Sequence, residues 1–359
     1  MQNVKRILSN TTPLCFMPDG RLVCYQHGEI VVLEKGSEID HFPLFYSKKE
    51  RILGRSRFLS RVLRLGVRAA EAIDKDTILL SVESVIYELS LKTKILSKGF
   101  SCGEGVRPLL FTTVKGIEGF ADGVYFGGYV HNFEKEPVSI YHRKGCDEWE
   151  VVYTFPKGTI NHVHSIITDP YRNCLWVLTG DFEESAAIWK AEDGFKTVER
   201  FVSGSQKWRG CVAFATQEGL LYATDAPFAQ NNVYLLKDDK TVSSVCGLSG
   251  SCIYGCQWND KYVFSTVVEP DGRNETLLRL LFGWKRGAGI TDNYARIYAG
   301  SISGGFKEVY KEKKDLLPFI FQFGAFRFPS GINMTANLCF QPVATKENDM
   351  ALTEISFSS

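Results

Sequence analysis

The sequence predicts an all-β protein, and three observations carry this prediction. Aromatic residues are abundant, with 25 Phe, 15 Tyr and 6 Trp, and aromatic side chains favour strands. The 32 glycines supply positions for tight turns between strands. One succession of strands and turns also recurs four times between about residue 105 and residue 281. Short strands repeated at a regular spacing are typical of an all-β repeat architecture.

Each of the four repeats contains three predicted strands. Their first strands open at residues 107, 162, 209 and 254, which are 55, 47 and 45 residues apart. This spacing is about the period of a four-stranded β-propeller blade. The predicted strands are 107–111, 123–129 and 138–141; 162–167, 175–181 and 187–189; 209–214, 220–225 and 232–236; and 254–258, 262–269 and 277–281.

Weaker copies of the repeat flank these four. The predicted strands are 14–17, 21–25, 29–33, 67–73, 77–83 and 85–91 upstream, and 319–323, 325–328 and 338–341 downstream. Apolar residues in 57–70 also fit a helical stripe, and we interpret this segment as a strand pair or a short insertion. Seven blades of about 51 residues use all 359 positions, so we expect one propeller domain over residues 1–359. Six blades remain the alternative if the two chain ends share a blade.

Charge and cysteine content narrow the expected partners and location. Lys plus Arg number 42 against 41 Asp plus Glu, so no overall charge favours nucleic acid or an anionic membrane. No apolar run is long enough to span a bilayer, and the N-terminal residues do not read as a secretory signal. The ten cysteines form no CxxC pair. Reduced, buried thiols are expected, which favours a cytoplasmic location.

Two turns after predicted third strands carry variants of the Asp-box, whose usual form is Ser-x-Asp-x-Gly-x-Thr-Trp. Residues 191–198 keep Asp193 and Thr197, and residues 142–149 keep Trp149. On these residues the chain resembles the sialidase-like, Asp-box (BNR) propellers, and residues 160–269 look most like bacterial members. The resemblance implies the propeller fold, because in that family the boxes are structural and lie opposite the active face.

The same resemblance does not supply a catalytic set. Sialidases hold a sugar carboxylate with three arginines and use a Tyr nucleophile paired with Glu, plus an Asp acid/base. Their Phe-Arg-Ile-Pro opening is absent here. Arg107-Pro108 resembles it only faintly and lies in a different part of the chain. The candidate site is therefore built from the repeat itself.

In a propeller, the start of each first strand and the end of each second strand lie on one face, around the central channel. Four carboxylates end second strands in this sequence: Glu83, Asp181, Asp225 and Glu269. Paired carboxylates in one concave site can divide acid and base roles, as glycoside hydrolysis requires. Acidic residues also support turns at strand ends, so a purely structural role stays open.

His162 and His164 stand two apart on a predicted strand, so both side chains face the channel. They are candidate general acid or base residues, with hydrogen-bonded structural histidines as the alternative. No cofactor is required by this hypothesis, but the pair could bind a divalent metal with Asp181 or Gln206 as a third ligand. Asn161-His162-Val163-His164 also resembles the His-x-His metal sites of propeller lyases that act on uronate oligosaccharides.

Arginines and aromatic residues complete the candidate site. Arg107 and Arg209 open first strands, where a guanidinium can bind a carboxylate, sulfate or phosphate, or form an internal ion pair with the acidic residues. Aromatic rings can stack on sugars or pack between blades. The candidate substrate-binding residues are Arg107, Tyr125, Tyr129, Gln206, Arg209 and Tyr254.

Together these features predict a protein that acts on an acidic oligosaccharide or glycoconjugate by glycoside hydrolysis. His162, His164, Asp181, Asp225 and Glu269 are its candidate catalytic residues. Two alternatives stay open. One is a noncatalytic propeller that binds a glycan or a protein in surface-polysaccharide metabolism, and the other is a metal-dependent uronate oligosaccharide lyase.

Overall fold

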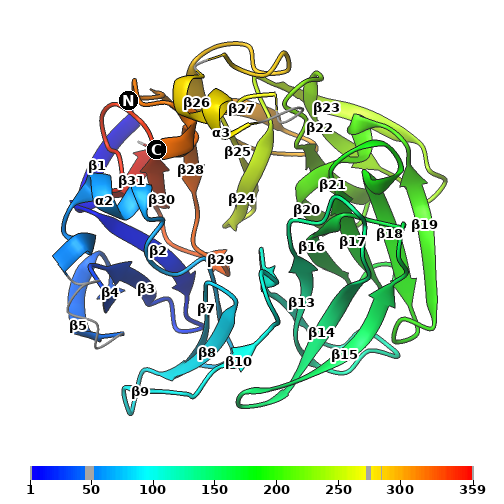
Figure 1. Ribbon diagram of the computed structural model, residues 1–359, viewed down its shortest axis with the longest axis horizontal. Coiled ribbons are helices and arrows are strands. Elements are labelled where there is room, and N and C mark those ends of the chain that lie inside the picture. The colour runs from blue at the N-terminus through cyan, green and yellow to red at the C-terminus, as the bar shows by residue number, and fades with distance from the viewer. Residues whose placement is uncertain (1, 45–51, 272–275, 284, 358–359) are drawn as a thin grey trace. The chain divides into compact units, whose positions relative to one another are not determined.

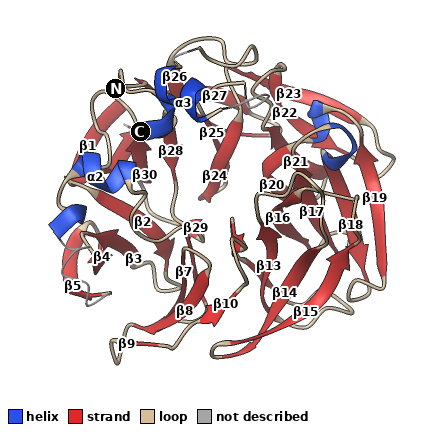
Figure 2. Ribbon diagram, in the orientation of Figure 1, coloured by secondary structure: helices blue, strands red, loops and turns tan. Residues whose placement is uncertain are grey.

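The structure is a computed structural model that describes residues 2–44, 52–271, 276–283 and 285–357. It is all-β, with seven blades of a β-propeller and very little helix (Figures 1 and 2). Each blade contains four main antiparallel strands, and three of the seven sheets add a fifth strand. The prediction of seven blades is therefore confirmed. The chain divides into two compact units, and each is described by itself.

Unit 2 spans residues 68–226 and 231–247 and contains four blades. The first blade is formed by β6 (Ala69–Ala72), β7 (Thr77–Val82), β8 (Val85–Ser90), β9 (Ile95–Leu96) and β10 (Phe100–Ser101). The second contains β11 (Arg107–Pro108), β12 (Thr112–Val114), β13 (Gly123–Tyr129), β14 (Val138–Gly145) and β15 (Glu148–Phe155). The third contains β16 (His162–Asp169), β17 (Cys174–Gly180), β18 (Ala187–Glu192) and β19 (Thr197–Ser203). The fourth contains β20 (Gly210–Thr216), β21 (Gly219–Thr224), β22 (Asn231–Leu236) and β23 (Val242–Leu248). Two 3₁₀ turns, η1 (Glu183–Ser185) and η2 (Gln206–Trp208), lie between strands.

Unit 1 spans residues 1–67, 227–230 and 248–359 and contains three blades. One is formed by β2 (Thr11–Phe16), β3 (Leu22–Gln26), β4 (Glu29–Glu34) and β5 (Ser37–Pro43). Another contains β24 (Cys252–Trp258), β25 (Lys261–Thr266), β26 (Tyr294–Ser301), β27 (Gly305–Lys313) and β29 (Ile332–Asn333). The last contains β1 (Gln2–Leu8), β28 (Ala325–Arg327), β30 (Leu338–Val343) and β31 (Leu352–Phe357). Because β1 pairs with β31, the two ends of the chain do share a blade, within a total of seven.

Two predicted strands are wrong, and so is the strand-pair alternative for residues 57–70. Residues 277–281 form helix α3 (Leu277–Phe282), and the third strand of that blade is β26 instead. Residues 319–321 form the 3₁₀ turn η3 (Phe319–Phe321). In segment 57–70, helix α2 (Arg57–Val62) precedes β6, so the helical stripe there was the correct signal. A short apolar run fits a buried strand and a helix equally well, which explains these errors.

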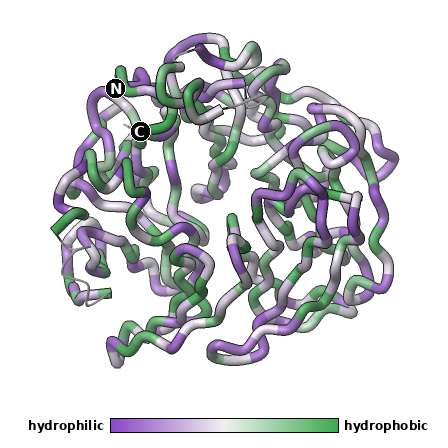
Figure 3. Tube along the Cα trace, in the orientation of Figure 1, coloured by the Kyte–Doolittle hydropathy of each residue, from purple (hydrophilic) through white to green (hydrophobic). Residues whose placement is uncertain are grey.

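The core lies between neighbouring sheets, as β17 illustrates. Side chains alternate across a strand, so Leu175 and Val177 pack toward β13–β15 while Trp176 and Leu178 pack toward β20–β22. All seven residues of β17 are buried for this reason. Hydrophobic and hydrophilic residues are interleaved along the rest of the trace (Figure 3).

All ten cysteines are free, and eight of them are buried. Within the described residues, no helix has the length and apolar character that a bilayer span requires.

Asp169 stabilises the turn between β16 and β17. Its buried carboxylate accepts hydrogen bonds from Trp176 Nε1 at 2.7 Å and from the Arg172 guanidinium at 3.1 Å, as well as from two backbone N–H groups. We expect Asp169→Ala to lower the free energy of unfolding by about 3–5 kcal/mol, because it leaves a buried guanidinium and indole N–H without this acceptor. Urea denaturation measures this change.

The matched control is Glu199→Ala, which breaks an exposed ion pair with Lys240. An exposed pair contributes about 1 kcal/mol or less. Equal losses in the two variants would show that Asp169 has no special structural role.

Candidate functional site

The start of β16 and the end of β17 place two histidines and an aspartate together in unit 2. His162 is the first residue of β16 and pairs with Gly180, the last residue of β17, so Asp181 follows directly. The register shifts between Val163 and Ser165, which leaves His164 as the extra residue of a β-bulge. Bulges re-aim side chains and are frequent next to functional sites.

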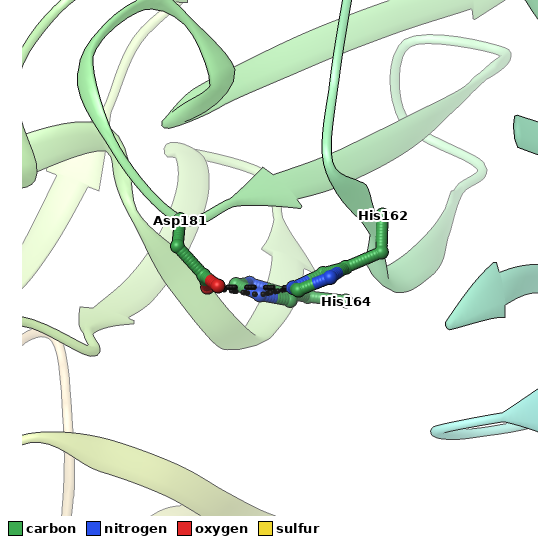
Figure 4. A group of neighbouring side chains, drawn as sticks. All are labelled: His162, His164 and Asp181. Atoms are coloured by element: carbon green, nitrogen blue, oxygen red, sulfur yellow. Dashed lines mark hydrogen bonds and ion pairs between the residues drawn. The ribbon is translucent and has the colours of Figure 1, made fainter. Parts of the chain in front are cut away.

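Three ligand-type atoms converge at this point (Figure 4). The Nε2 atoms of His162 and His164 lie 3.0 Å apart, and each lies 3.3 Å from Oδ1 of Asp181. Both imidazoles are buried, whereas the Asp181 side chain is 27% exposed. The group is therefore open to solvent on the Asp181 side.

The backbone fixes the protonation of both rings at Nδ1. The Nδ1 atom of His162 lies 3.0 Å from the carbonyl oxygen of Val130, and that of His164 lies 2.9 Å from the carbonyl oxygen of Gly210. A carbonyl only accepts hydrogen bonds, so each Nδ1 carries a hydrogen. A ring that carries no second hydrogen then presents a lone pair on Nε2 to the other ring and to the carboxylate oxygen.

A proton or a metal ion between these three atoms would satisfy all of them. Burial lowers the pKa of His162, and this effect outweighs the raising effect of Asp181, so the neutral ring is favoured. Burial alone would raise the pKa of Asp181, but contacts with both histidines and the charge of Arg209 hold it well below its usual range. The carboxylate is therefore ionised, and its Oδ1 atom faces the Nε2 atoms of both imidazoles.

The three atoms fit a divalent metal ion. A metal bound about 2.1 Å from its ligands places neighbouring ligand atoms about 3.0 Å apart in octahedral geometry and about 3.4 Å apart in tetrahedral geometry. The observed separations of 3.0 and 3.3 Å fall in this range. Metal-binding histidines also typically donate the other ring N–H to a carbonyl or carboxylate, as both do here.

Neighbouring residues hold this trio in place. Asn161 accepts a hydrogen bond from the backbone N–H of Asp181, and Gln206 donates one to the Asp181 carbonyl oxygen at 3.0 Å. The peptide bond between Gly180 and Asp181 is cis. A Cβ atom on Gly180 would lie 2.2 Å from Cε1 of His164, so the His164 ring packs directly on the glycine backbone.

Arg209 connects the trio to a second aspartate. One of its terminal nitrogens lies 3.2 Å from Oδ1 of Asp181 and 3.3 Å from Oδ2 of Asp225. Cys211 donates a weak hydrogen bond to the same Asp225 oxygen, and burial keeps its pKa well above the usual range, so the thiol stays protonated. Arg209 thus forms the internal ion pair that the sequence left open.

Tyr129 lies beside His162, and Arg107 lies beside Tyr129. The Tyr129 ring is 4.3 Å from the His162 ring, centroid to centroid, and Cζ of Arg107 is 5.5 Å from the Tyr129 centroid. Burial, together with nearby acidic groups, raises the pKa of Tyr129, so its hydroxyl stays protonated. Among the described residues, no acidic side chain forms an ion pair with Arg107.

The remaining candidate residues lie elsewhere. Tyr125 is in the core, where it stacks on His142 and its hydroxyl donates to a backbone carbonyl. Glu83 is an exposed turn residue between β7 and β8. Glu269 and Tyr254 belong to unit 1, where the Glu269 carbonyl accepts a bond from Gly287 and the Tyr254 ring lies 5.8 Å from Cζ of Arg327. We therefore build the site from unit 2 alone.

Sequence reasoning missed Cys211 and Gly180. Alignment of the repeats held a signal for Cys211, because it takes the same place after Arg209 that His164 takes after His162. The structure bears this out, since Cys211 is the extra residue of an equivalent bulge in β20. For Gly180 the contact with His164 depends on the bulge, which the sequence did not indicate.

No protein-family model matches this sequence, and neither does the sequence of any curated protein. Solved structures do resemble it. An oligogalacturonate lyase in complex with manganese has a TM-score of 0.61 at 10% identity, covering 99% of this chain and 93% of the lyase. The β-propeller domain of Cps50 (Swd1) from Myceliophteria thermophila has a TM-score of 0.56 at 10% identity, covering 99% and 98%. The AfRom2 CNH domain has a TM-score of 0.55 at 8% identity, covering 99% and 100%. These similarities establish the propeller fold, and a sialidase or Asp-box family is not confirmed.

Proposed function

We propose that the chain is a metal-dependent lyase that acts on uronate-containing oligosaccharides. The observation that carries this proposal is the convergence of His162 Nε2, His164 Nε2 and Asp181 Oδ1 within 3.0–3.3 Å, with both Nδ1 atoms committed to carbonyls. The propeller fold shared with a manganese-bound oligogalacturonate lyase adds support.

Charge also favours an anionic substrate. Histidines bind a metal as neutral ligands, so Asp181 and Asp225 would balance Arg209 and Arg107, and a bound divalent cation would give the site a net positive charge. Arg107 has no ion-pair partner among the described residues, which leaves its guanidinium available to a sugar carboxylate.

The reaction class follows from this chemistry. His162, His164 and Asp181 would hold the cation, and Arg107 would orient the uronate carboxylate. A divalent cation bound there would supply Lewis acidity toward that carboxylate, which would make the neighbouring C5–H more acidic. Elimination breaks the C5–H and C4–O bonds and forms a C4=C5 double bond. A base removes the proton from C5, and the departing glycosidic oxygen gains a proton, so no net proton is released. No oxidant, reductant or water is consumed.

Glycoside hydrolysis has less support from this geometry. A general acid needs a carboxyl whose pKa is raised, whereas the pKa of Asp181 is lowered and Arg209 pairs with both aspartates.

The proposal is tested with oligogalacturonates and other uronate oligosaccharides in the presence of Mn²⁺. The expected result is ultraviolet absorbance from an unsaturated product, which a chelator abolishes and added Mn²⁺ restores. New reducing ends without this absorbance would indicate hydrolysis. Binding of the oligosaccharides without any product would indicate a noncatalytic propeller.

Arg107→Gln separates substrate binding from metal binding. We expect KM for the uronate substrate to rise at least about tenfold, because a charge-assisted contact with the carboxylate is lost, while Mn²⁺ affinity stays the same. Steady-state kinetics and calorimetric titration measure the two effects. Unchanged KM would remove Arg107 from the site.

A further inference from the structure

An ordinary surface helix buries apolar residues and exposes charged ones. In helix α2 of unit 1 this pattern is reversed. Its Arg61 side chain is only 4% exposed and pairs with Asp315 at 2.5 Å and Asp349 at 3.1 Å. Phe58, by contrast, is 49% exposed, and Val62 one turn later is exposed too. The apolar face of α2 therefore points outward.

Helix α3 also exposes apolar residues. Leu278 and Phe282, four residues apart, are 68% and 70% exposed. Both α2 and α3 contact η3, and the Phe58 ring lies 5.7 Å from that of Phe321 in η3. Large exposed apolar patches mark interaction sites. We call this set the apolar patch: Phe58, Val62, Leu63, Leu278, Phe282 and Leu316.

Exposed basic residues lie in the same two segments as these apolar residues. Residues 52–66 contain four arginines and no acidic residue, and residues 276–286 contain three basic residues and no acidic residue. Arg61 is buried in its ion pairs, and Arg57 also pairs with Asp349 at 3.4 Å. The exposed members are Arg55, Arg57, Arg64 and Lys285, which we call the basic rim. The chain as a whole has a formal net charge of only +1, so this concentration is local.

We propose that the apolar patch and its basic rim dock this protein on an anionic phospholipid surface. Short helices with exposed Leu and Phe flanked by Arg and Lys insert their apolar side chains at the headgroup boundary, while the cations meet lipid phosphates. A second copy of the chain is a poorer occupant, because face-to-face pairing would bring two basic rims together. This proposal is independent of the metal site.

Flotation of the full chain with vesicles tests the proposal. The protein is expected to float with phosphatidylcholine vesicles that contain phosphatidylglycerol, less so at high salt, and not with phosphatidylcholine alone. Leu278→Ser/Phe282→Ser is expected to lower the partition coefficient at least about tenfold, and Arg55→Gln/Arg64→Gln about tenfold.

Phe133→Ser is the matched control, because Phe133 is an equally exposed aromatic residue in unit 2. Its partition coefficient should match that of the unaltered protein. The proposal is overturned if the unaltered protein does not bind anionic vesicles, or if the control variant loses as much vesicle binding as the patch variants. A concentration-dependent dimer that Leu278→Ser/Phe282→Ser abolishes, without vesicle binding, would assign the patch to a contact between copies instead.

Discussion

Asp181→Asn is expected to weaken Mn²⁺ binding at least about 100-fold and to abolish lyase activity. The substitution removes the one anionic ligand of the trio, so the cation loses both a charge and a coordinating carboxylate oxygen. The fold should survive the substitution. In the unaltered protein, Nε2 of His162 lies beside Nε2 of His164 and a carboxylate oxygen, and the new amide can donate a hydrogen bond to this Nε2 atom. Calorimetric titration with Mn²⁺ and thermal unfolding with and without the metal measure both effects.

The control for Asp181→Asn is His41→Ala, which removes an exposed histidine in β5 of unit 1. It should leave the Mn²⁺ affinity and the metal-dependent rise in Tm unchanged. Retention of full Mn²⁺ affinity in Asp181→Asn would contradict the assignment of the ligands.

Gly180→Ala should damage the metal centre without removing any ligand. The added methyl group would lie 2.2 Å from Cε1 of His164, so the ring must move away from His162 and Asp181. Overpacking of this kind costs about 1–3 kcal/mol of stability, and we expect Mn²⁺ affinity to fall at least about tenfold. Urea denaturation and calorimetric titration report the two losses separately.

Gly247→Ala is the matched substitution for that experiment. Its Cβ atom would meet nothing closer than 3.9 Å, and it lies in β23 of the same unit. This variant should bind Mn²⁺ normally. If Gly180→Ala also bound the metal normally, the position of His164 would not matter for the centre.

Much of the fold could be predicted because each blade repeats one pattern. The second strand predicted at 123–129 is β13 to the residue, and the first strands at 107 and 162 begin where predicted. The helices were harder to predict. Leu277–Phe282 is a run of six residues whose apolar content suits a strand or a helix, and only its surroundings decide between them.

Parts of the site were predictable for a similar reason. His162 and His164 stand at the start of a first strand and Asp181 at the end of the second, and pairing of β16 with β17 brings these ends together. The sequence could not show that Tyr125 belongs to the core and Tyr129 to the site. Both residues lie in the same strand, and only their contacts with the neighbouring sheet differ. The ion pairs of Arg209 likewise depend on contacts between blades.

The most direct test of the metal centre is a crystal structure of the full chain with Mn²⁺, with diffraction data collected at the manganese absorption edge. We expect one anomalous peak within about 2.3 Å of His162 Nε2, His164 Nε2 and Asp181 Oδ1. Absence of a peak there, with the two Nε2 atoms still in contact, would mean that a proton and not a metal ion joins the three groups, and the lyase proposal would fail with the metal centre.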